Sequence, residues 1–501
     1  MDSMGPTEKT HIVGDNQTMH TPALASSHMN TADTAGLVDN TDGEAGDFDA
    51  DKQAAKPEER SGITGASFNT ANSILGSGII GLPYAMKQAG LPFGIILLVI
   101  TATVTDYSMV LLIKGGELSG TNTYQDVVQS AFGIPGYYLL TAIQFVYPFV
   151  AMIGYNVIIG DTITKVFVRV FSAVDFNTTF EHVLANRYFI ISIITVMVSL
   201  PLSLYRNVTK LVKVAVISLI LLVVIMLVVI IRLGTYDVPD TPNPWQFGKI
   251  HFTESIGIMA FAFVCHHNSF LIFSSLETPT TVTWSKVTHL AVLIAFLACA
   301  LVGICGYATF TGFTQGDLLE NYCYSDDLAN MARILFAITI ICTYPLECFV
   351  CREVLEHLAV RHAWVSSEPQ PFTRHMILTL IIVGLTLAFS MSTSCLGIVL
   401  SLNGILCAIP LVFILPTACY VRLAEGRWFA KHKIPSLLIG TLGVIVTVFG
   451  FVTLFIDTSL SKCQDPGALP YCTKDQAIIN SSMPIPPTAE PSFVSTISPF
   501  P

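Results

Sequence analysis

A hydrophobic stretch near the start of the chain, residues 65–87, is interrupted by Gly76-Ser77-Gly78, with a third glycine and a proline close behind. It is long enough to enter a bilayer, whose core needs about 20 apolar residues per helix, but these residues disfavour one continuous helix. Free backbone groups inside a membrane must line a cavity or meet a ligand. A half-helix that begins at Gly78-Ile79-Ile80 would offer N–H groups to a carboxylate, while half-helix C-termini leave carbonyl oxygens for a cation.

A second break lies in the stretch at residues 253–275, where the polar residues from His266 to Ser269 stand mid-span. Because it falls five spans after the first break, spans one to five and six to ten would form two five-helix halves of opposite orientation. Broken helices at corresponding positions of two inverted halves point to a transporter's central site. For either break alone, a kink in a packed helix is the alternative. The predicted substrate site consists of Gly76, Ser77, Gly78, Ile79, His266, His267 and Asn268.

Other chemistry at these residues fits less well. The run from Gly76 to Gly81 matches G-x-G-x-x-G, but a dinucleotide site needs a preceding strand and a soluble helix. Cys265, His266 and His267 are adjacent, so their side chains point in different directions on a helix and favour no metal site. Either histidine could be proton-sensitive or simply hydrogen-bonded within the structure. We predict no enzyme activity, no cofactor, and no metal other than sodium.

Composition indicates an all-α protein that crosses a membrane many times. The chain is 52% hydrophobic and 12% charged, against about 25% charged residues in soluble domains, and its mean hydropathy is +0.63. Its surroundings are therefore the lipid bilayer, and we expect no nucleic-acid partner. A surface helix is predicted over residues 124–132. Eleven membrane spans are predicted, at residues 65–87, 91–113, 137–160, 188–205, 209–231, 253–275, 287–311, 328–350, 373–391, 396–421 and 434–456.

The chain divides into three parts by composition. Residues 1–61 carry much of the acid behind the net charge of −10 and have no apolar periodicity, so we predict a disordered cytosolic N-terminus. It lacks a cleavable signal peptide, so the first span would direct insertion. Residues 62–457 hold the eleven helices, and residues 458–501 form a tail.

Orientation follows from the basic residues. With the N-terminus in the cytosol, 16 of the 25 Lys and Arg residues fall on the cytosolic side, as the positive-inside rule favours. Eleven spans then place the tail outside, together with the glycosylation sequons at Asn177 and Asn480. A third sequon, at Asn207, falls inside and is predicted to be unused. These features indicate a membrane of the secretory pathway, and we expect the plasma membrane rather than the lysosome.

The 12 cysteines fall into two groups. Nine lie in or beside spans and are expected to act as small apolar side chains. Cys323, Cys463 and Cys472 lie outside, where oxidation can occur. Cys463 and Cys472 are close enough in sequence to form a disulfide, and a bond from Cys323 to either one is the alternative.

Span eight adds polar groups at membrane depth. Thr339 and Thr343 are four residues apart and share one helix face just before a proline. Their hydroxyls could help to bind a cation, or they could bond carbonyls of their own helix. Asp106 and Glu347 are ionisable residues inside spans, which makes them functional candidates, although solvation at the cytosolic side would also account for them.

The first span, from Phe68-Asn69 to Gly81-Leu82, resembles the signature of the amino acid/auxin permease group, in particular its sodium-coupled neutral amino acid transporters, the solute carrier 38 branch. The run from Cys265 to Glu277 is similar to the same branch, and the resemblance extends over residues 62–457. It implies a LeuT-like 5+5 inverted repeat with spans one and six discontinuous, followed by one extra C-terminal helix.

The resemblance also implies a sodium site between spans one and eight. The family's asparagine matches Asn72 and its threonine matches Thr343, and carbonyls near Leu75 and Thr339 would complete the site by analogy. One departure is His267, where many relatives carry proline.

The expected function is secondary active transport of small neutral amino acids with sodium by alternating access, with coupling to protons left open. A sensor or receptor that uses the same pocket without transport is the alternative, with the acidic N-terminus as its signalling element. An ion channel fits poorly, because no ring of charges is visible.

Overall fold

The computed structural model describes residues 60–174, 183, 186–205, 208–249, 251–362, 364, 372–393, 395–457 and 469–472. Every regular element in these ranges is a helix, and the one strand-like pairing among them is an isolated bridge between Ser61 and Leu276. The prediction of an all-α membrane protein is confirmed. Eight of the described helices are long and apolar enough to cross a membrane by themselves.

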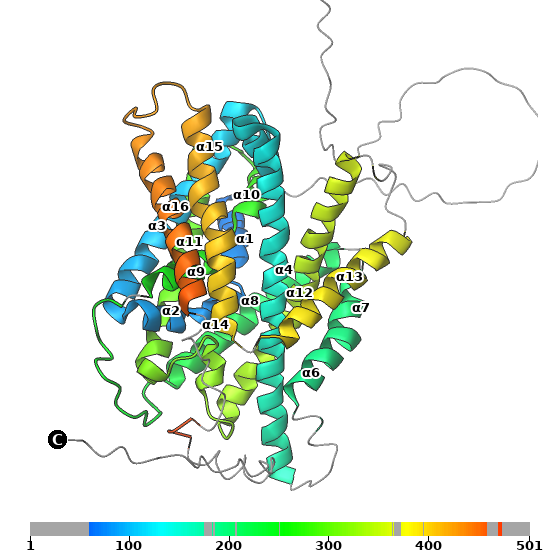
Figure 1. Cartoon of the computed structure of the whole chain (residues 1–501), viewed down its shortest axis with the longest axis vertical. Helices are drawn as coiled ribbons and strands as arrows, with labels where there is room; N and C mark the ends of the chain where they lie inside the picture. The colour runs from blue at the N-terminus through cyan, green and yellow to red at the C-terminus, as the bar shows by residue number, and fades with distance from the viewer. Residues whose placement is uncertain are drawn as a thin grey trace, which may run out of the picture. The chain divides into compact units, whose positions relative to one another are not determined.

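The helices follow one another through connections that range from a single turn to the 20 residues between Ile231 and Phe252 (Figure 1). Those labelled η2, η6 and η7 are π-helical turns, and the other η elements are 3₁₀ turns. The elements are α1 (Ile63–Ile74), η1 (Ser77–Gly81), α2 (Leu82–Ala89), α3 (Leu91–Ser119), α4 (Tyr124–Val174), α6 (Arg187–Ile194), η2 (Thr195–Ser199), α7 (Leu200–Ser203), α8 (Val208–Ile231), α9 (Phe252–Ala262), η3 (His266–Asn268), α10 (Ser269–Ser274), α11 (Thr281–Phe310), η4 (Thr311–Phe313), η5 (Leu318–Asn321), α12 (Asp327–Arg361), α13 (Phe372–Met391), α14 (Leu396–Asn403), η6 (Gly404–Ala408), η7 (Pro410–Ile414), α15 (Leu415–Leu423) and α16 (Ile434–Asp457).

Each of the eleven predicted spans coincides with helix in the structure. The first, however, is divided into short pieces, and the predicted spans at 188–205 and 209–231 coincide with shorter apolar helices. The surface helix predicted before the third span forms the beginning of α4. Gly133 separates it from the rest of α4, because its positive φ of 69° interrupts the helix at a conformation that glycine adopts easily.

Both predicted breaks are present. α1 ends at Ile74, and after Leu75 and Gly76 the chain makes the 3₁₀ turn η1 before α2 begins. In the second stretch, α9 ends at Ala262 and α10 begins only at Ser269. Glycines and a proline explain the first break, and four consecutive polar or polarisable residues mark the second.

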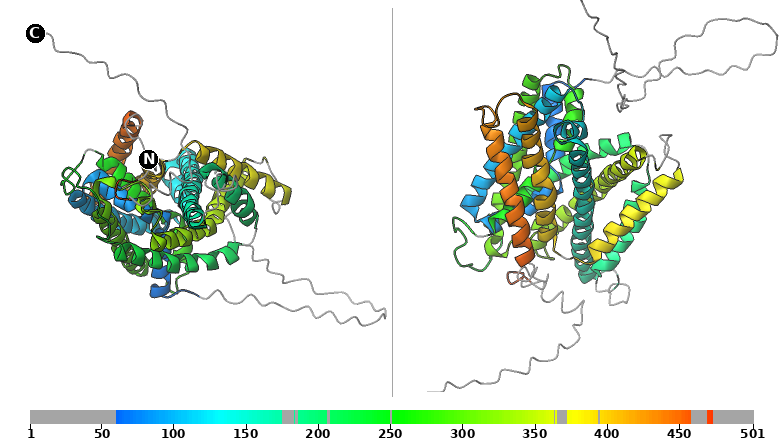
Figure 2. Two further views of the ribbon diagram at one scale, coloured as in Figure 1. Left: turned by 90° about the horizontal axis from the view of Figure 1, so that it is seen from below. Right: turned by 45° about the horizontal axis from the view of Figure 1, so that its top comes forward.

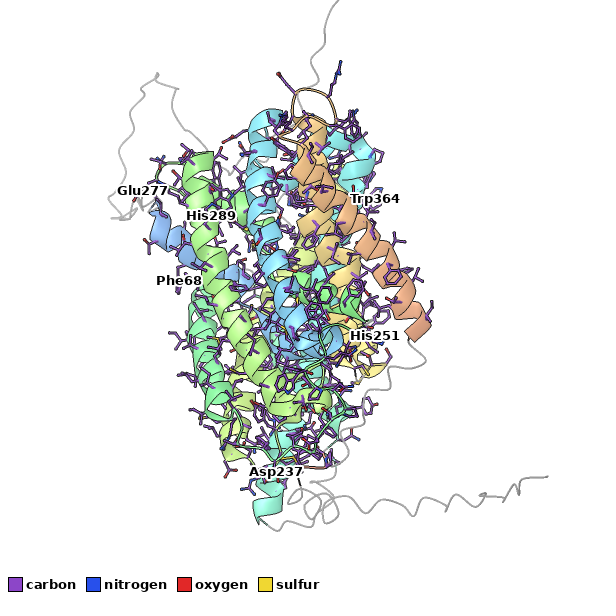
Figure 3. The ribbon with its side chains drawn as sticks, turned by 90° about the vertical axis from the view of Figure 1, so that its left-hand side faces the viewer. Phe68, Asp237, His251, Glu277, His289 and Trp364 are labelled. Atoms are coloured by element: carbon purple, nitrogen blue, oxygen red, sulfur yellow. A yellow bond between two sulfur atoms is a disulfide. The ribbon has the colours of Figure 1, made fainter. Side chains whose placement is uncertain are left out.

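The two broken stretches lie beside each other along their length. At one end, Ser61 before α1 pairs through its backbone with Ser275 and Glu277 after α10, at 2.8 and 3.3 Å. In the other half, α2 packs on α9, and Ser255 Oγ donates to the carbonyl of Ala85 at 2.7 Å. Figure 3 shows Glu277 and Asp237 at opposite ends of this helical unit.

Other helices surround this pair. In Figures 1 and 2, α4 runs upright through the helical unit, and α12 and α13 lean across one side of it. η6 contacts the opposite side of α9 so closely that a Cβ on Gly404 would lie 1.9 Å from the carbonyl oxygen of Gly257. Only glycine allows two backbones to approach this closely.

One disulfide bond differs from the first expectation. Cys472 is bonded to Cys323, at a sequence separation of 149, and not to Cys463, which lies outside the described residues. The alternative pairing is therefore correct, because the fold brings the segment before α12 back to the chain that follows α16. Cys395, expected to be a simple apolar side chain, is also disulfide-bonded. The sequons at Asn177, Asn207 and Asn480 lie outside the described residues.

Candidate functional site

The turn after the first break presents free backbone groups. Hydrogen bonding within η1 begins at the N–H of Ile79, which donates to the carbonyl of Gly76, so the N–H groups of Ser77 and Gly78 keep their donor capacity. On the other side of the break, the carbonyl of Leu75 accepts no hydrogen bond from the described residues. The first break can therefore bind an anion with its N–H groups and a cation with a carbonyl.

The two breaks touch at Gly78. A Cβ at this position would lie 2.7 Å from Cα of Ala262 and 3.1 Å from the ring of Phe261, at the end of α9. Gly76 differs, because a Cβ there would meet nothing within 4 Å. The absence of a side chain at Gly78 thus allows the two breaks to come into contact, while Gly76 borders open space.

A side-chain hydrogen bond also joins the two breaks. Asn268, in η3, donates from Nδ2 to Oγ of Ser73, in the last turn of α1, at 2.8 Å. The fold therefore brings Asn268 to the first break, as the sequence predicted for this pair of stretches.

The two histidines lie elsewhere. His266 is fully buried, and its Nε2 lies 2.8 Å from Oγ of Ser108 on α3, so its ring contacts α3. His267 is exposed, and its ring centroid lies 6.4 Å from that of Tyr147 on α4. The contacts of His266 agree with a hydrogen-bonded structural histidine, which was one of its two predicted roles.

A narrow crevice opens beside Ser77, between the first break and α4. It is mostly apolar and too narrow to hold a water molecule. Nδ2 of Asn403 donates to the carbonyl of Tyr147 at 3.0 Å, and its Oδ1 is buried without a partner among the described residues. The crevice is lined by Ser77, Val150, Ala151, Gly154, Tyr155, Ile158, Phe261, Val399, Leu400 and Asn403.

Sequence reasoning missed most of this lining. Tyr155, Phe261 and Asn403 come from three stretches that are far apart in the chain, so no local motif joins them. The available signal was Asn403 itself, an amide in the middle of an apolar span, because polar groups at membrane depth are seldom without a role.

Tyr155 connects the crevice with α12. Its hydroxyl donates to Oε1 of Glu347 at 3.4 Å, and its side chain lines the crevice together with Ser77. Glu347 follows Thr343 by four residues and so shares its helix face. An ionisable side chain of α12 is thereby linked to the first break through a single tyrosine.

No hydrogen bond among the described residues joins the predicted sodium ligands of the first broken stretch to those of α12. Thr343 Oγ1 donates to the carbonyl of Thr339 at 2.8 Å, and Thr339 Oγ1 to that of Leu335 at 3.0 Å. Both hydroxyls bond their own helix, yet each oxygen keeps lone pairs for another ligand. The side chain of Asn72 makes no hydrogen bond to the described residues, so its amide oxygen is also free to bind a cation.

Comparisons with known proteins identify the family of this chain. The family model "Transmembrane amino acid transporter protein" matches residues 59–459. A Danio rerio protein named "Putative sodium-coupled neutral amino acid transporter 11" is 44% identical over 438 residues, which cover 87% of this chain and 94% of that protein. A Rattus norvegicus protein of the same name is 48% identical over 419 residues, which cover 83% and 89%.

The fold is similar to that in the crystal structure of MhsT in complex with L-phenylalanine. The TM-score is 0.50 at 14% identity, and the match covers 80% of this chain and 100% of that chain. MhsT has the LeuT fold, so the fold expected from the resemblance is supported. The chain therefore belongs to the transmembrane amino acid transporter family, and it is a multi-pass membrane protein for transport rather than an enzyme.

Proposed function

We propose that this protein is a secondary active transporter of small neutral amino acids, driven by sodium through alternating access. Its family and the names of its relatives support amino acid transport with sodium. The observation that carries the proposal is the meeting of the two breaks at Gly78 and at the Asn268–Ser73 hydrogen bond, beside free backbone groups.

The chemistry of these groups suits a zwitterion. The N–H groups of Ser77 and Gly78 would bind the carboxylate, since the start of a helical turn favours negative charge. The crevice beside them supplies Phe261, Val399 and Leu400 for an apolar side chain, and no charged residue lines it. A charged amino acid would leave its side-chain charge unpaired there, which is costly.

The narrow crevice implies movement. A site with no room for a water molecule must widen before an amino acid can enter. We assign this change to the two broken stretches, which are bonded to each other through Ser61 at one end and through Ser255 in the other half. If the two broken stretches separate at one of these two contacts while the other contact stays closed, the site would open to one side of the membrane at a time.

For sodium we propose Asn72, Thr343 and the carbonyls of Leu75 and Thr339. Sodium prefers hard oxygen ligands, and all four groups supply them. His266, in η3, would support the site through its contact with Ser108 on α3, whereas Gly76, Ile79 and His267 would border the bound amino acid.

We further propose eleven spans in a 5+5 inverted repeat plus one helix, with a cytosolic N-terminus and an extracytosolic tail. The Cys323–Cys472 bond supports this orientation, since disulfides persist in oxidising compartments. Asn177 and Asn480 would then carry glycans, and the plasma membrane is the proposed location.

Uptake of labelled amino acids into proteoliposomes tests the function. We expect accumulation of neutral amino acids under an inward sodium gradient, and little when N-methylglucamine replaces sodium. Equal uptake without sodium would refute the coupling. Saturable binding without accumulation would favour the sensor and refute transport.

A further inference from the structure

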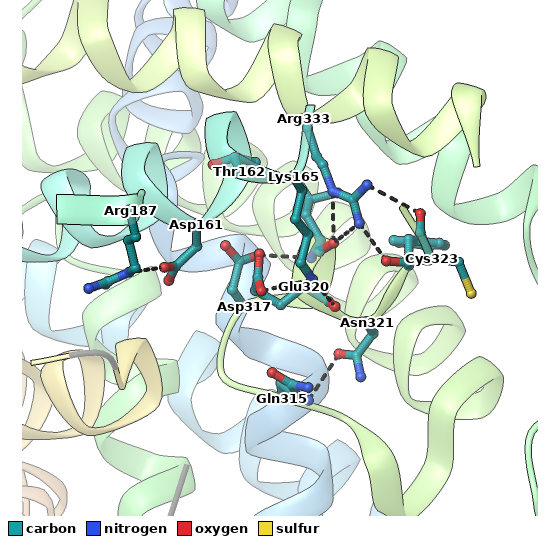
Figure 4. Close-up of polar contacts among 12 residues, drawn as sticks. Asp161, Thr162, Lys165, Arg187, Gln315, Asp317, Glu320, Asn321, Cys323 and Arg333 are labelled. Atoms are coloured by element: carbon teal, nitrogen blue, oxygen red, sulfur yellow. Dashed lines mark hydrogen bonds and ion pairs between the residues drawn. The ribbon is translucent and has the colours of Figure 1, made fainter. Parts of the chain in front are cut away.

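A mostly buried group of charged side chains, outside the paired breaks, lies where α4 meets the segment at residues 311–326 (Figure 4). Nζ of Lys165 lies 2.8 Å from Oε2 of Glu320 and donates to the carbonyl of Glu320 at 2.6 Å. Arg187 forms an ion pair with Asp161 next to it. We call Asp161, Lys165, Arg187, Asp317 and Glu320 the outer cluster.

Within the outer cluster, Asp317 is the carboxylate that forms no ion pair with a described residue. It is 2% exposed, and its Oδ1 accepts the N–H of Leu319 at 2.8 Å. Its Oδ2 is buried with no hydrogen-bond partner among the described residues, and the same is true of Oε1 of Glu320. One proton on either carboxyl would supply the donor that these oxygens lack.

The neighbouring cations do not fill this role. Lys165 is engaged by Glu320, and Arg187 by Asp161. Arg333 on α12 is fully buried, but its guanidinium donates to the carbonyls of Leu319 and Tyr322 and to other oxygens around it, and to no carboxylate.

A proton suits the outer cluster better than a metal ion. The ammonium of Lys165 is already 2.8 Å from Glu320 and would repel a metal cation. Burial, and then the negative charge of Glu320, raise the pKa of Asp317 well above its ordinary value. Figure 4 shows Asp161, Asp317 and Glu320 close to one another. Among the described residues, the charged groups that face Asp317 are therefore the other members of the outer cluster and Arg333.

The segment held by the outer cluster covers the first broken stretch. Nζ of Lys87, on α2, donates to the carbonyl of Thr314 at 2.8 Å. A Cβ on Gly316 would lie 2.3 Å from the backbone nitrogen of Gly397, at the start of α14. The segment therefore lies directly against α2 and α14, and its hold on α4 depends on the Lys165–Glu320 pair and its surroundings.

We propose that the outer cluster is a proton-binding latch. One proton, held on Asp317 or shared with Glu320, keeps the segment 311–326 closed on α4. Its release to water leaves adjacent buried carboxylates that repel each other, and the segment loosens. Neither sodium nor an amino acid takes part, so the latch goes beyond the proposed function.

The direction of the pH effect follows from linkage. A carboxyl with a raised folded-state pKa stabilises the fold fully below its unfolded pKa of about 3.9, and this contribution is lost as the pH rises through the folded value. The latch should therefore weaken as the solution becomes alkaline. Asp317→Asn fixes the neutral state and should remove that loss.

The test measures thermal unfolding of the purified full chain, and amide hydrogen exchange over residues 314–321, at pH 5 and pH 8. We expect Asp317→Asn to be more stable than wild type by a margin that grows by a few degrees in unfolding temperature from pH 5 to pH 8. Exchange in the segment, corrected for the intrinsic pH effect, should speed up at pH 8 in wild type only. Asp327→Asn, at an exposed ion pair nearby, should behave as wild type.

A temperature difference between Asp317→Asn and wild type that is the same at both pH values would overturn the latch, as would segment exchange that does not depend on pH. If Asp317→Asn does not fold, infrared spectra at pH 7 decide. Wild type should show a protonated-carboxyl band that weakens or shifts in Glu320→Gln, and identical bands would refute the shared proton. None of these measurements depends on transport.

Discussion

The paired breaks and the outer cluster lie close together but differ in the chemical groups that form them. The breaks consist of backbone groups, glycines and a few neutral side chains, and Gly78 lets α9 approach directly. The outer cluster consists of ionisable side chains, with Lys165 and Glu320 both nearly inaccessible. The contrast indicates that the proposed ligand site contains few strong internal bonds, while the segment at residues 311–326 that covers it is held by ion pairs.

The strongest test of this contrast is to remove the positive charge of Lys165, which pairs with Glu320. Lys165→Met should lower the free energy of unfolding by about 3–5 kcal/mol, because it leaves Glu320 buried without its partner. Arg169→Met is the matched control, since the exposed Arg169–Asp327 pair should contribute about 1 kcal/mol or less. Thermal unfolding of the purified variants measures both, and equal effects would mean that burial does not distinguish these pairs.

A smaller effect is expected from the backbone contact at the breaks. Gly78→Ala places a Cβ 2.7 Å from Cα of Ala262, and such overpacking costs about 1–3 kcal/mol. We expect amino acid uptake to fall by roughly tenfold or more, whereas Gly76→Ala, which meets nothing, should stay near wild type. Uptake normalised to the amount of protein in the membrane checks this, and a strong loss in Gly76→Ala alone would reverse the assignment.

The sodium site gives the next prediction. Thr343→Ala should raise the sodium concentration for half-maximal uptake by about tenfold, the equivalent of about 1.4 kcal/mol, with the order of preferred amino acids kept. Thr343→Ser retains the hydroxyl and should stay close to wild type. If the alanine variant keeps its sodium dependence, then the hydroxyl of Thr343 only donates a hydrogen bond to the carbonyl of Thr339 and does not bind sodium.

The smallest predicted effect concerns Asp326, which forms an ion pair with Arg232. Burial would raise the pKa of Asp326, but hydrogen bonds from Tyr236 and Arg232 outweigh it and hold the pKa below its ordinary value. The stabilisation is therefore present above the unfolded pKa of about 3.9 and is lost as the pH falls through the folded value.

Asp326→Asn should accordingly unfold at a lower temperature than wild type at pH 7, by the equivalent of about 1 kcal/mol. The difference should shrink as the pH falls below about 4. Asp237→Asn, at the exposed position next to Tyr236 in the sequence, is the control and should show no such trend. A constant difference from pH 7 to pH 3.5 would exclude the ion pair as its source.

The sequence was informative where a local pattern carries the physics. Runs of apolar residues predicted the helices, and the glycines around Ser77 and the polar run at His266 predicted both breaks. The outer cluster was not predicted, because Asp161 and Asp317 are far apart in the chain and meet only through packing of α4 against the segment before α12.

The same reason explains the remaining errors. Closeness in sequence favoured a Cys463–Cys472 bond, whereas the fold brings Cys323 to Cys472. Asn403 reaches the crevice from α14, which no spacing rule relates to Ser77. Local chemistry can thus be read from neighbouring residues, but a partner from a distant helix cannot.

The Cys323–Cys472 bond also sets an order of events during biosynthesis. Cys472 follows α16 in the chain, so the bond can form only after every described helix has been synthesised. Until then, the segment before α12 lacks its covalent link to the tail. The segment that covers the first broken stretch is therefore linked covalently in a late maturation step, by oxidation of two thiols after all the described helices have been synthesised.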